Sequence, residues 1–188
     1  MGQIKMKIRK AFINDAKKIA EIKYYTWLDA YKDILGKELI ESNMNINEQA
    51  KKIESQIRSN DKNSSYYVCS VGDNIVAYCL LLYKSDNFRD DEDSFIGSTL
   101  SEMNIGECML SALYVLPENQ RGGVGQFFFD WIKSWCKERN ISKIFWNCYA
   151  ENKKAVNFYL KNNACIIDEN IGETFGKTAK GYEMELNI

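Results

Sequence analysis

The chain has 188 residues, of which 45% are apolar, and its formal net charge at pH 7 is −1. This length and apolar content predict a single domain over residues 1–188 with a sizeable core. The near-neutral charge argues against a general nucleic-acid-binding protein, and no apolar run reaches the length that spans a membrane.

The N-terminal part predicts a strand, two helical regions and a hairpin. Residues 4–9 alternate apolar and charged side chains, as in a strand. Asn14 or Asp15 can cap a helix, and a second helical region runs from Gly36 to about Ser59. The inner face of the first helix is expected to carry Ala16, Ala20, Trp27, Leu28 and Tyr31, with Ile19 beside it. Residues 66–71 and 75–83 flank a Gly-Asp-Asn turn typical of a hairpin.

The C-terminal part alternates strands and helices. Residues 84–106 are polar and acidic and predict a long loop. A buried strand over 110–116 ends at Pro117, and a helix then begins at Gly123. The apolar face of that helix is predicted to be Val124, Phe127, Phe128, Trp131, Ile132 and Trp135. A strand over 143–148, a helix over 153–162 and strands near 164–171 and 181–186 follow. This order predicts an α/β fold.

Histidine and cysteine usage narrows the chemistry. The chain has no histidine, so a Ser-His-Asp triad, a Cys-His pair and a histidine-ligated metal site are excluded, and we expect no metal. Proton transfer must then use Glu, Asp, Tyr, Cys, Lys or water. The six cysteines show no paired spacing, which favours buried thiols in a reducing compartment. Since residues 1–10 do not form a signal peptide, we expect a cytoplasmic protein.

A glycine-rich turn stands between the strand that ends at Pro117 and the next helix. Its sequence from residue 120 is Gln-Arg-Gly-Gly-Val-Gly. Such a turn leaves backbone N–H groups unpaired at the positive end of the helix dipole. These residues predict an anion site, for which a diphosphate is the natural occupant. The glycine spacing fits neither the dinucleotide fingerprint nor the nucleoside-triphosphate loop.

The turn resembles motif A of the GCN5-related N-acetyltransferases, Gln/Arg-x-x-Gly-x-Gly/Ala, which binds the pyrophosphate of acetyl-coenzyme A. Residues 113–118 resemble the strand ending that precedes this motif, and residues 152–159 resemble the next family signature. Residues 8–16 look like the family's opening Ile-Arg-x-Ala-x-x-x-Asp-Ala. The resemblance covers nearly the whole chain. It implies a mixed, twisted central sheet of about seven strands with helices on both faces.

The resemblance also implies where acetyl-coenzyme A, the cosubstrate, is held. Its pantetheine arm is expected between the strands that end at Leu116 and Cys148. Backbone groups of Leu113, Tyr114 and Val115 would meet this arm. The pyrophosphate would meet the amides of Arg121, Gly122, Gly123, Val124, Gly125 and Gln126. The Arg121 side chain either adds charge there or stays solvated, and Asn152 either only caps its helix or also reaches the cosubstrate.

Tyr159 is the candidate general acid, because the family's tyrosine at this place protonates the departing thiolate. The alternative is that it packs against the sheet with Phe158. Many relatives carry a glutamate base where this chain has Met109. Glu107 lies two residues earlier on the same strand face, so it either acts as a base through water or is a solvated residue at the strand start. Asn163 replaces a family glycine and is expected to tolerate the left-handed turn there.

Trp27 and Tyr31 resemble the Trp-x-x-x-Tyr pair that lines the acceptor side of the cleft in bacterial small-molecule members, although core positions explain them equally well. The predicted function is direct transfer of an acetyl group from acetyl-coenzyme A to a primary amine of a small molecule or peptide, with a homodimer as one expected assembly. The alternatives are a non-catalytic coenzyme A-binding module, or an acyltransferase for a protein N-terminus or an aminoacyl-tRNA. The net charge weighs against the tRNA. Acidic residues 86–93 either attract cationic amines at the acceptor entrance or form a solvated loop.

Overall fold

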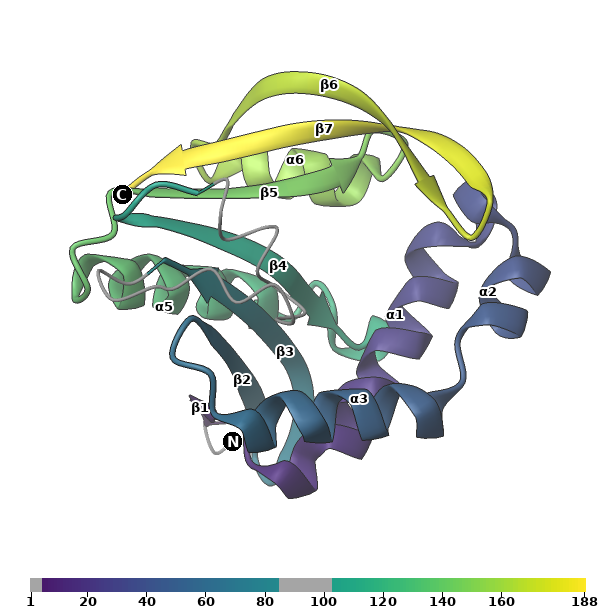
Figure 1. Ribbon diagram of the computed structural model, residues 1–188, viewed down its shortest axis with the longest axis horizontal. Helices are drawn as coiled ribbons and strands as arrows, with labels where there is room; N and C mark the ends of the chain where they lie inside the picture. Colours follow the sequence, from purple (N-terminus) through teal and green to yellow (C-terminus); the bar gives the residue numbers. More distant parts are fainter. Residues whose placement is uncertain (1–4, 85–102) are drawn as a thin grey trace.

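The central element is one mixed sheet of seven strands in the order β1-β2-β3-β4-β5-β7-β6 (Figure 1). The strands are β1 (Met6–Lys10), β2 (Ser64–Val71), β3 (Asn74–Tyr83), β4 (Glu107–Val115), β5 (Lys143–Tyr149), β6 (Cys165–Thr174) and β7 (Lys177–Asn187). Among the described strands, only β4 and β5 run parallel, and the other neighbours are antiparallel. The computed structural model describes residues 5–84 and 103–188, so acidic residues 86–93 lie outside the described part. The predicted fold class is confirmed.

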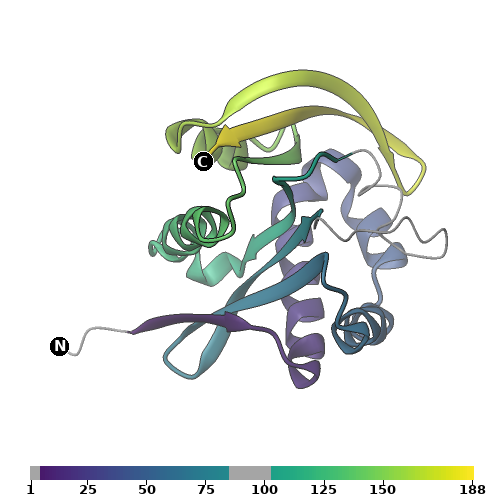
Figure 2. The same ribbon diagram turned by 60° about the vertical axis from the view of Figure 1, so that its left-hand side comes forward.

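Helices cover both faces of the sheet. One face carries α1 (Ala16–Leu35), α2 (Lys37–Asn43) and α3 (Ile46–Ser59), and the other carries α5 (Val124–Lys137) and α6 (Lys153–Lys161). Figure 2 shows α1 and α3 on one side of the strands and α5 on the other. The core is divided accordingly. Phe128, Phe129 and Ile132 of α5 pack with the sheet in one cluster, and Ile19, Ile22 and Ile53 of α1 and α3 pack in another.

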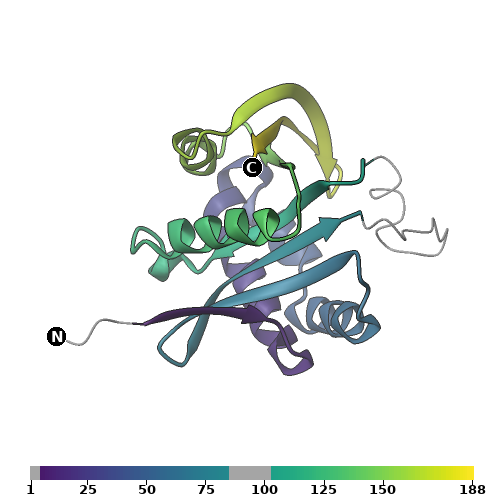
Figure 3. The ribbon, with the colours of Figure 1, turned by 90° about the vertical axis from the view of Figure 1, so that its left-hand side faces the viewer.

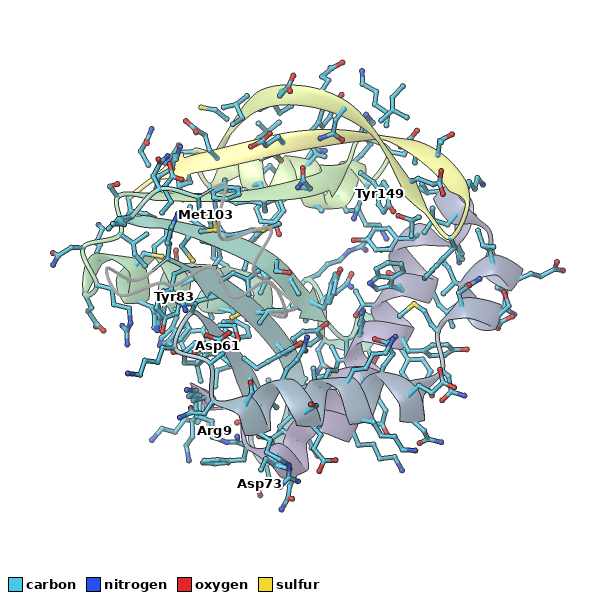
Figure 4. The ribbon with its side chains drawn as sticks, in the orientation of Figure 1. Arg9, Asp61, Asp73, Tyr83, Met103 and Tyr149 are labelled. Atoms are coloured by element: carbon cyan, nitrogen blue, oxygen red, sulfur yellow. The ribbon has the colours of Figure 1, made fainter. Side chains whose placement is uncertain are left out.

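The start of α1 is fixed by a carboxylate. Asp15 accepts two hydrogen bonds from the Arg9 guanidinium, at 2.6 and 2.9 Å, and a third from the Phe12 backbone N–H, at 2.7 Å. Arg9 lies beside the beginning of α1 (Figure 4). The predicted inner face of this helix was partly wrong. Ile22 and Thr26 are buried with Ala16, Ile19 and Ala20, whereas Trp27, Leu28 and Tyr31 are only partly buried.

Two other helical predictions need correction. The helical region after Gly36 is two helices, because the Asn45 side chain accepts hydrogen bonds from the N–H groups of Asn47 and Glu48 and begins α3 as a new helix. The buried face of α5 includes Phe129, which is fully buried, while Phe127 is 37% exposed. Phe129 packs edge-on against Trp146 of β5 and Phe158 of α6, so α5 is rotated relative to the predicted face. Figure 3 shows this helix lying across the strands. Asn163 adopts the expected left-handed backbone, with a φ of 67°.

Candidate active site

The two parallel strands in the middle of the sheet part from each other. β4 and β5 pair only at Glu107 with Lys143, Cys108 with Ile144, and Met109 with Phe145. Beyond these pairs both strands continue, to Val115 and Tyr149, without pairing to each other. Since backbone N–H and C=O groups inside a protein require hydrogen-bond partners, the diverging strand edges form a place where a ligand can complete the sheet.

A cavity of about 880 Å³ opens at this divergence. Its size is in the range of small-molecule binding sites. Its walls come from α1, β4, β5, the glycine-rich turn and α6. Among the predicted site residues, those that line it are Tyr31, Leu113, Tyr114, Val115, Arg121, Gly125, Asn152 and Tyr159. Trp27, Glu107, Gly122, Gly123, Val124 and Gln126 are not lining residues.

The glycine-rich turn places the N-terminus of α5 beside the cavity. Gly123 is the N-cap residue, with a φ of 83° that side chains with a Cβ rarely adopt, and no side chain caps this helix. The first amide bonded to the helix backbone is that of Phe127, which donates to the Gly123 carbonyl at 2.9 Å. The amides from Gly123 to Gln126 therefore have no acceptor within the helix. Arg121, Lys153 and Lys154 line the same cavity, so its charge there suits an anion.

Two polar side chains make hydrogen bonds at the start of α6 and between α5 and α6. The Asn152 Oδ1 atom accepts a hydrogen bond from the Ala155 N–H at 3.2 Å, which confirms that Asn152 caps α6. The Gln126 amide group donates to Asn162 at the end of α6 and to Asp130. The Gln126 side chain is thus used in packing, and only its backbone N–H belongs to the exposed helix start.

The end of β4 is held by two side chains that sequence reasoning missed. Thr26 Oγ1 and Gln120 Nε2 both donate to the Val115 carbonyl, at 3.3 and 3.1 Å. The Leu116 N–H donates to Val76 on the β3 side. Because backbone groups alternate between the two edges of a strand, Leu113 and Val115 present theirs to the gap and Tyr114 presents its own to β3. No sequence signal joins Thr26 to Val115, since the two residues are 89 positions apart.

Tyr159 lies in the cavity wall on α6. Its ring packs against Trp146 at 4.5 Å between centroids and against Phe129 at 5.7 Å. In the described part of the chain, its hydroxyl makes no hydrogen bond. Burial raises the pKa of Tyr159 far above its usual value, and the neighbouring Cys148 and Tyr114 add to the rise. The phenol is therefore protonated at neutral pH and can donate a proton.

Three more groups in the cavity wall are kept neutral by burial. Burial raises the pKa of Tyr31, to which Tyr114 and Cys148 contribute further. It also raises the pKa of Tyr114, against a lowering effect of the adjacent Trp27 and Tyr31 side chains. The Cys148 thiol has a pKa of about 11 for the same reason. Since all three groups are protonated at pH 7, none is an effective base.

An aromatic row lies behind this wall. Tyr31 packs edge-on against Trp27 and Tyr149, each at 5.1 Å, and Trp27 in turn contacts Phe175 at the β6–β7 turn. Figure 4 shows Tyr149 at the end of β5, next to that turn. Trp27 thus supports Tyr31 from behind.

The structure argues against Glu107 as the base. Although burial opposes ionisation, hydrogen bonds from Lys143 and Asn104 keep the pKa of Glu107 below its usual value. The Lys143 ammonium lies 2.7 Å from its carboxylate. Glu107 also stands at the paired end of β4 and β5, whereas the cavity opens where these strands diverge. The sequence spacing did not reveal this, because the parallel register that brings Lys143 to Glu107 is a tertiary feature.

The carboxylates that do line the cavity are Asp29 and Asp33 on α1 and Glu151 before α6. Asp29 and Asp33 are four residues apart, so they lie on one face of the helix. Among the described residues, no cationic side chain lies within 4.0 Å of either aspartate. The same described ranges contain no group of three or more cysteine, aspartate or glutamate side chains placed to hold a metal ion. They also contain no helix with the length and apolar content needed to cross a bilayer.

Residues 24–163 match the model of the acetyltransferase (GNAT) family, and the chain belongs to this family. Among solved structures, the PaiA N-acetyltransferase of Thermoplasma acidophilum, in complex with coenzyme A, has a TM-score of 0.68 at 18% identity, covering 98% of this chain and 99% of that one. The ribosomal-protein-S18-alanine N-acetyltransferase of Escherichia coli has a TM-score of 0.63 at 13% identity, covering 98% and 94%. A spermidine N-acetyltransferase chimera from Vibrio cholerae and hSSAT has 0.68 at 17%, covering 97% and 95%. Such identities show a shared fold. No curated protein matches the sequence.

Proposed function

We propose that the protein transfers an acetyl group from acetyl-coenzyme A to a primary amine within this cavity. The observation that carries the proposal is the divergence of β4 and β5 beside the N-terminus of α5. The amides of a pantetheine arm can pair with the backbone groups of Leu113 and with the N–H of Val115. The Val115 carbonyl already accepts hydrogen bonds from Thr26 and Gln120. The amides at the start of α5 and the cations Arg121, Lys153 and Lys154 can receive the phosphates. The residues present therefore fit this cosubstrate.

Tyr159 is the group proposed to act in the chemical step. As the amine attacks the thioester carbonyl, the C–S bond breaks, and coenzyme A leaves more easily when its sulfur receives a proton. A thiol has a pKa of roughly 8.5, so a protonated phenol held in the cavity wall is a suitable donor. No protein base is assigned, because Met109 stands at the family position and Glu107 is paired with Lys143. The proton of the attacking amine is proposed to pass to water and to return through water to the Tyr159 oxygen, which restores the phenol for the next turnover.

The acceptor is proposed to be an amine that carries a second positive charge. Asp29 and Asp33 bring two carboxylates to the cavity, and no described cation pairs with them at short range. Carboxylates in a concave site raise the local concentration of cationic ligands. Structural neighbours are named for spermidine and for a ribosomal-protein alanine, so both a small polyamine and a protein are candidate acceptors. The unpaired aspartates favour the small cation here.

One observation favours a second candidate, a module that binds coenzyme A without catalysis. Met109 replaces the usual base, and Glu107 does not line the cavity. Release of coenzyme A thiol from acetyl-coenzyme A, measured with and without a panel of mono- and diamines, separates the two. Amine-dependent thiol release supports the acetyltransferase. Binding of coenzyme A without thiol release supports the module, and no binding at all contradicts both.

A further inference from the structure

The last strand of the sheet, β6, is exposed along almost its full length. Every residue from Cys165 to Glu173 is solvent-exposed. Three isoleucines are among them: Ile166 is 39% exposed, Ile167 is 48% exposed and Ile171 is 79% exposed. β6 pairs only with β7, and within the described residues no strand pairs with its outer edge. In Figure 1 it forms the upper rim of the molecule.

The opposite edge of the sheet is protected in the usual way. β1 has five residues, and its exposed side chains are Lys7, Arg9 and Lys10. Short, charged edge strands discourage pairing with other chains. β6 has ten residues and presents isoleucines instead. A long edge of this kind is a template for the addition of another strand.

We propose that β6 pairs with β6 of a second copy of the chain, antiparallel about a two-fold axis at Asn170, and so joins two sheets into one. Two-fold dimers are the commonest homo-oligomers, and each contributes the same surface patch. Because β6 ends its sheet, such pairing needs no rearrangement of the other strands.

The charges on β6 and the position of its bulge together select this register. With Asn170 opposite itself, Glu169 faces Ile171 and Asp168 faces Gly172, so no two carboxylates are directly opposed. A centre at Glu169 would oppose that carboxylate to itself, and a centre at Ile171 would oppose Glu169 to Glu173. Like charges directly opposite each other destabilise a strand pair. A bulge between Ile166 and Asp168 ends the regular pairing on one side and leaves residues 168–172 as its centre.

The same register removes the most exposed isoleucine from water. Ile171 of one copy lies opposite Glu169 of the second and diagonal to that copy's Ile171, within reach of side-chain contact. A basic peptide attracted by Asp168, Glu169 and Glu173 is the competing occupant of this edge. Such a peptide would leave the purified protein monomeric, so the assembly state of the chain alone separates the two.

The first test is the solution mass of the full chain by light scattering and sedimentation velocity. The monomer mass is 21.8 kDa, and we expect twice this mass for the wild type. Ile171→Lys should return it to the monomer without loss of folding, because the side chain is 79% exposed in the single chain. Ile105→Lys is the matched control, since Ile105 is 64% exposed on another surface, and it should remain dimeric. A wild-type monomer at every concentration up to about 100 μM, where micromolar affinity would show, overturns the proposal.

The second test reports the register itself. In a Cys165→Ser background, Asn170→Cys should form a disulfide between two copies under mild oxidation, because opposed residues in a strand pair have Cα atoms about 5 Å apart. Glu173→Cys lies on the same exposed strand but about 20 Å from its counterpart in this register, so it should not cross-link. Equal cross-linking of both variants, or none at position 170, overturns the assigned pairing.

Discussion

Replacing Tyr159 by phenylalanine removes one oxygen atom from the cavity wall and leaves the packing in place. The ring keeps its contacts with Trp146 and Phe129, at 4.5 and 5.7 Å between centroids. Since no described group hydrogen-bonds to the hydroxyl, its loss leaves no partner unsatisfied. The free energy of unfolding and the affinity for coenzyme A should therefore change little.

The rate of acetyl transfer should respond differently. A positioned general acid contributes a factor of roughly 10² or more, so kcat should fall by at least this factor, equivalent to about 2.7 kcal/mol in the activation free energy. The assay is steady-state thiol release with a saturating amine, together with calorimetric titration of coenzyme A. Tyr83→Phe is the control: it removes a hydroxyl from a ring that packs on Trp135, outside the cavity lining, and should keep the wild-type kcat.

A Tyr159→Phe enzyme with wild-type kcat would refute the assignment of a general acid, and catalysis would then depend on positioning alone. A large loss of coenzyme A affinity would contradict it in another way, because it would mean that the hydroxyl serves in binding.

Three further predictions follow from the same geometry. Gly125→Val should weaken coenzyme A binding at least tenfold by calorimetry, while the thermal midpoint of unfolding stays close to that of the wild type. A Cβ at Gly125 meets Val115 and Phe158 only at ordinary contact distance, so the added methyl groups project toward the cavity. The double variant Asp29→Asn, Asp33→Asn should raise KM for a diamine more than for a neutral monoamine, and an equal change for both would reject the cationic acceptor. Burial raises the pKa values of Tyr78 and Tyr159, so the folded protein binds more protons than the unfolded chain above pH 10. The free energy of unfolding should therefore keep its full value below about pH 10. Above that pH it should fall by up to about 1.4 kcal/mol per pH unit for each tyrosine. Denaturant titrations that give the same unfolding free energy at pH 9 and pH 11 would contradict this last expectation.

Short sequence patterns predicted most of the secondary structure. A few consecutive residues determine each of three features: the glycine-rich turn, the hairpin at Gly72 and the strand that ends at Pro117. The structure has them close to the predicted bounds. The rotation of α5 could not be read in the same way. Phe127, Phe128 and Phe129 are consecutive and equally apolar, and only the packing against Trp146 and Phe158 decides that Phe129 is buried and Phe127 is not.

In the candidate site too, some features could be predicted from the sequence and others depend on the tertiary structure. Its glycine turn and Tyr159 belong to contiguous motifs and could be found from sequence. The hold of Thr26 on Val115 and the pairing of Glu107 with Lys143 depend on which strand lies beside which, and no local pattern encodes them. The exposure of β6 is of this kind too, because its mixture of isoleucines and acidic residues does not show whether another element covers the strand.

In the function proposed above, coenzyme A completes the sheet between β4 and β5. Hydrogen exchange of the backbone amides, followed by mass spectrometry with and without coenzyme A, tests it most directly. We expect slower exchange on binding in residues 110–116 and 121–126, with no change in β2. Unchanged exchange in both segments at saturating coenzyme A, or protection confined to other strands, would show that coenzyme A does not bind between β4 and β5.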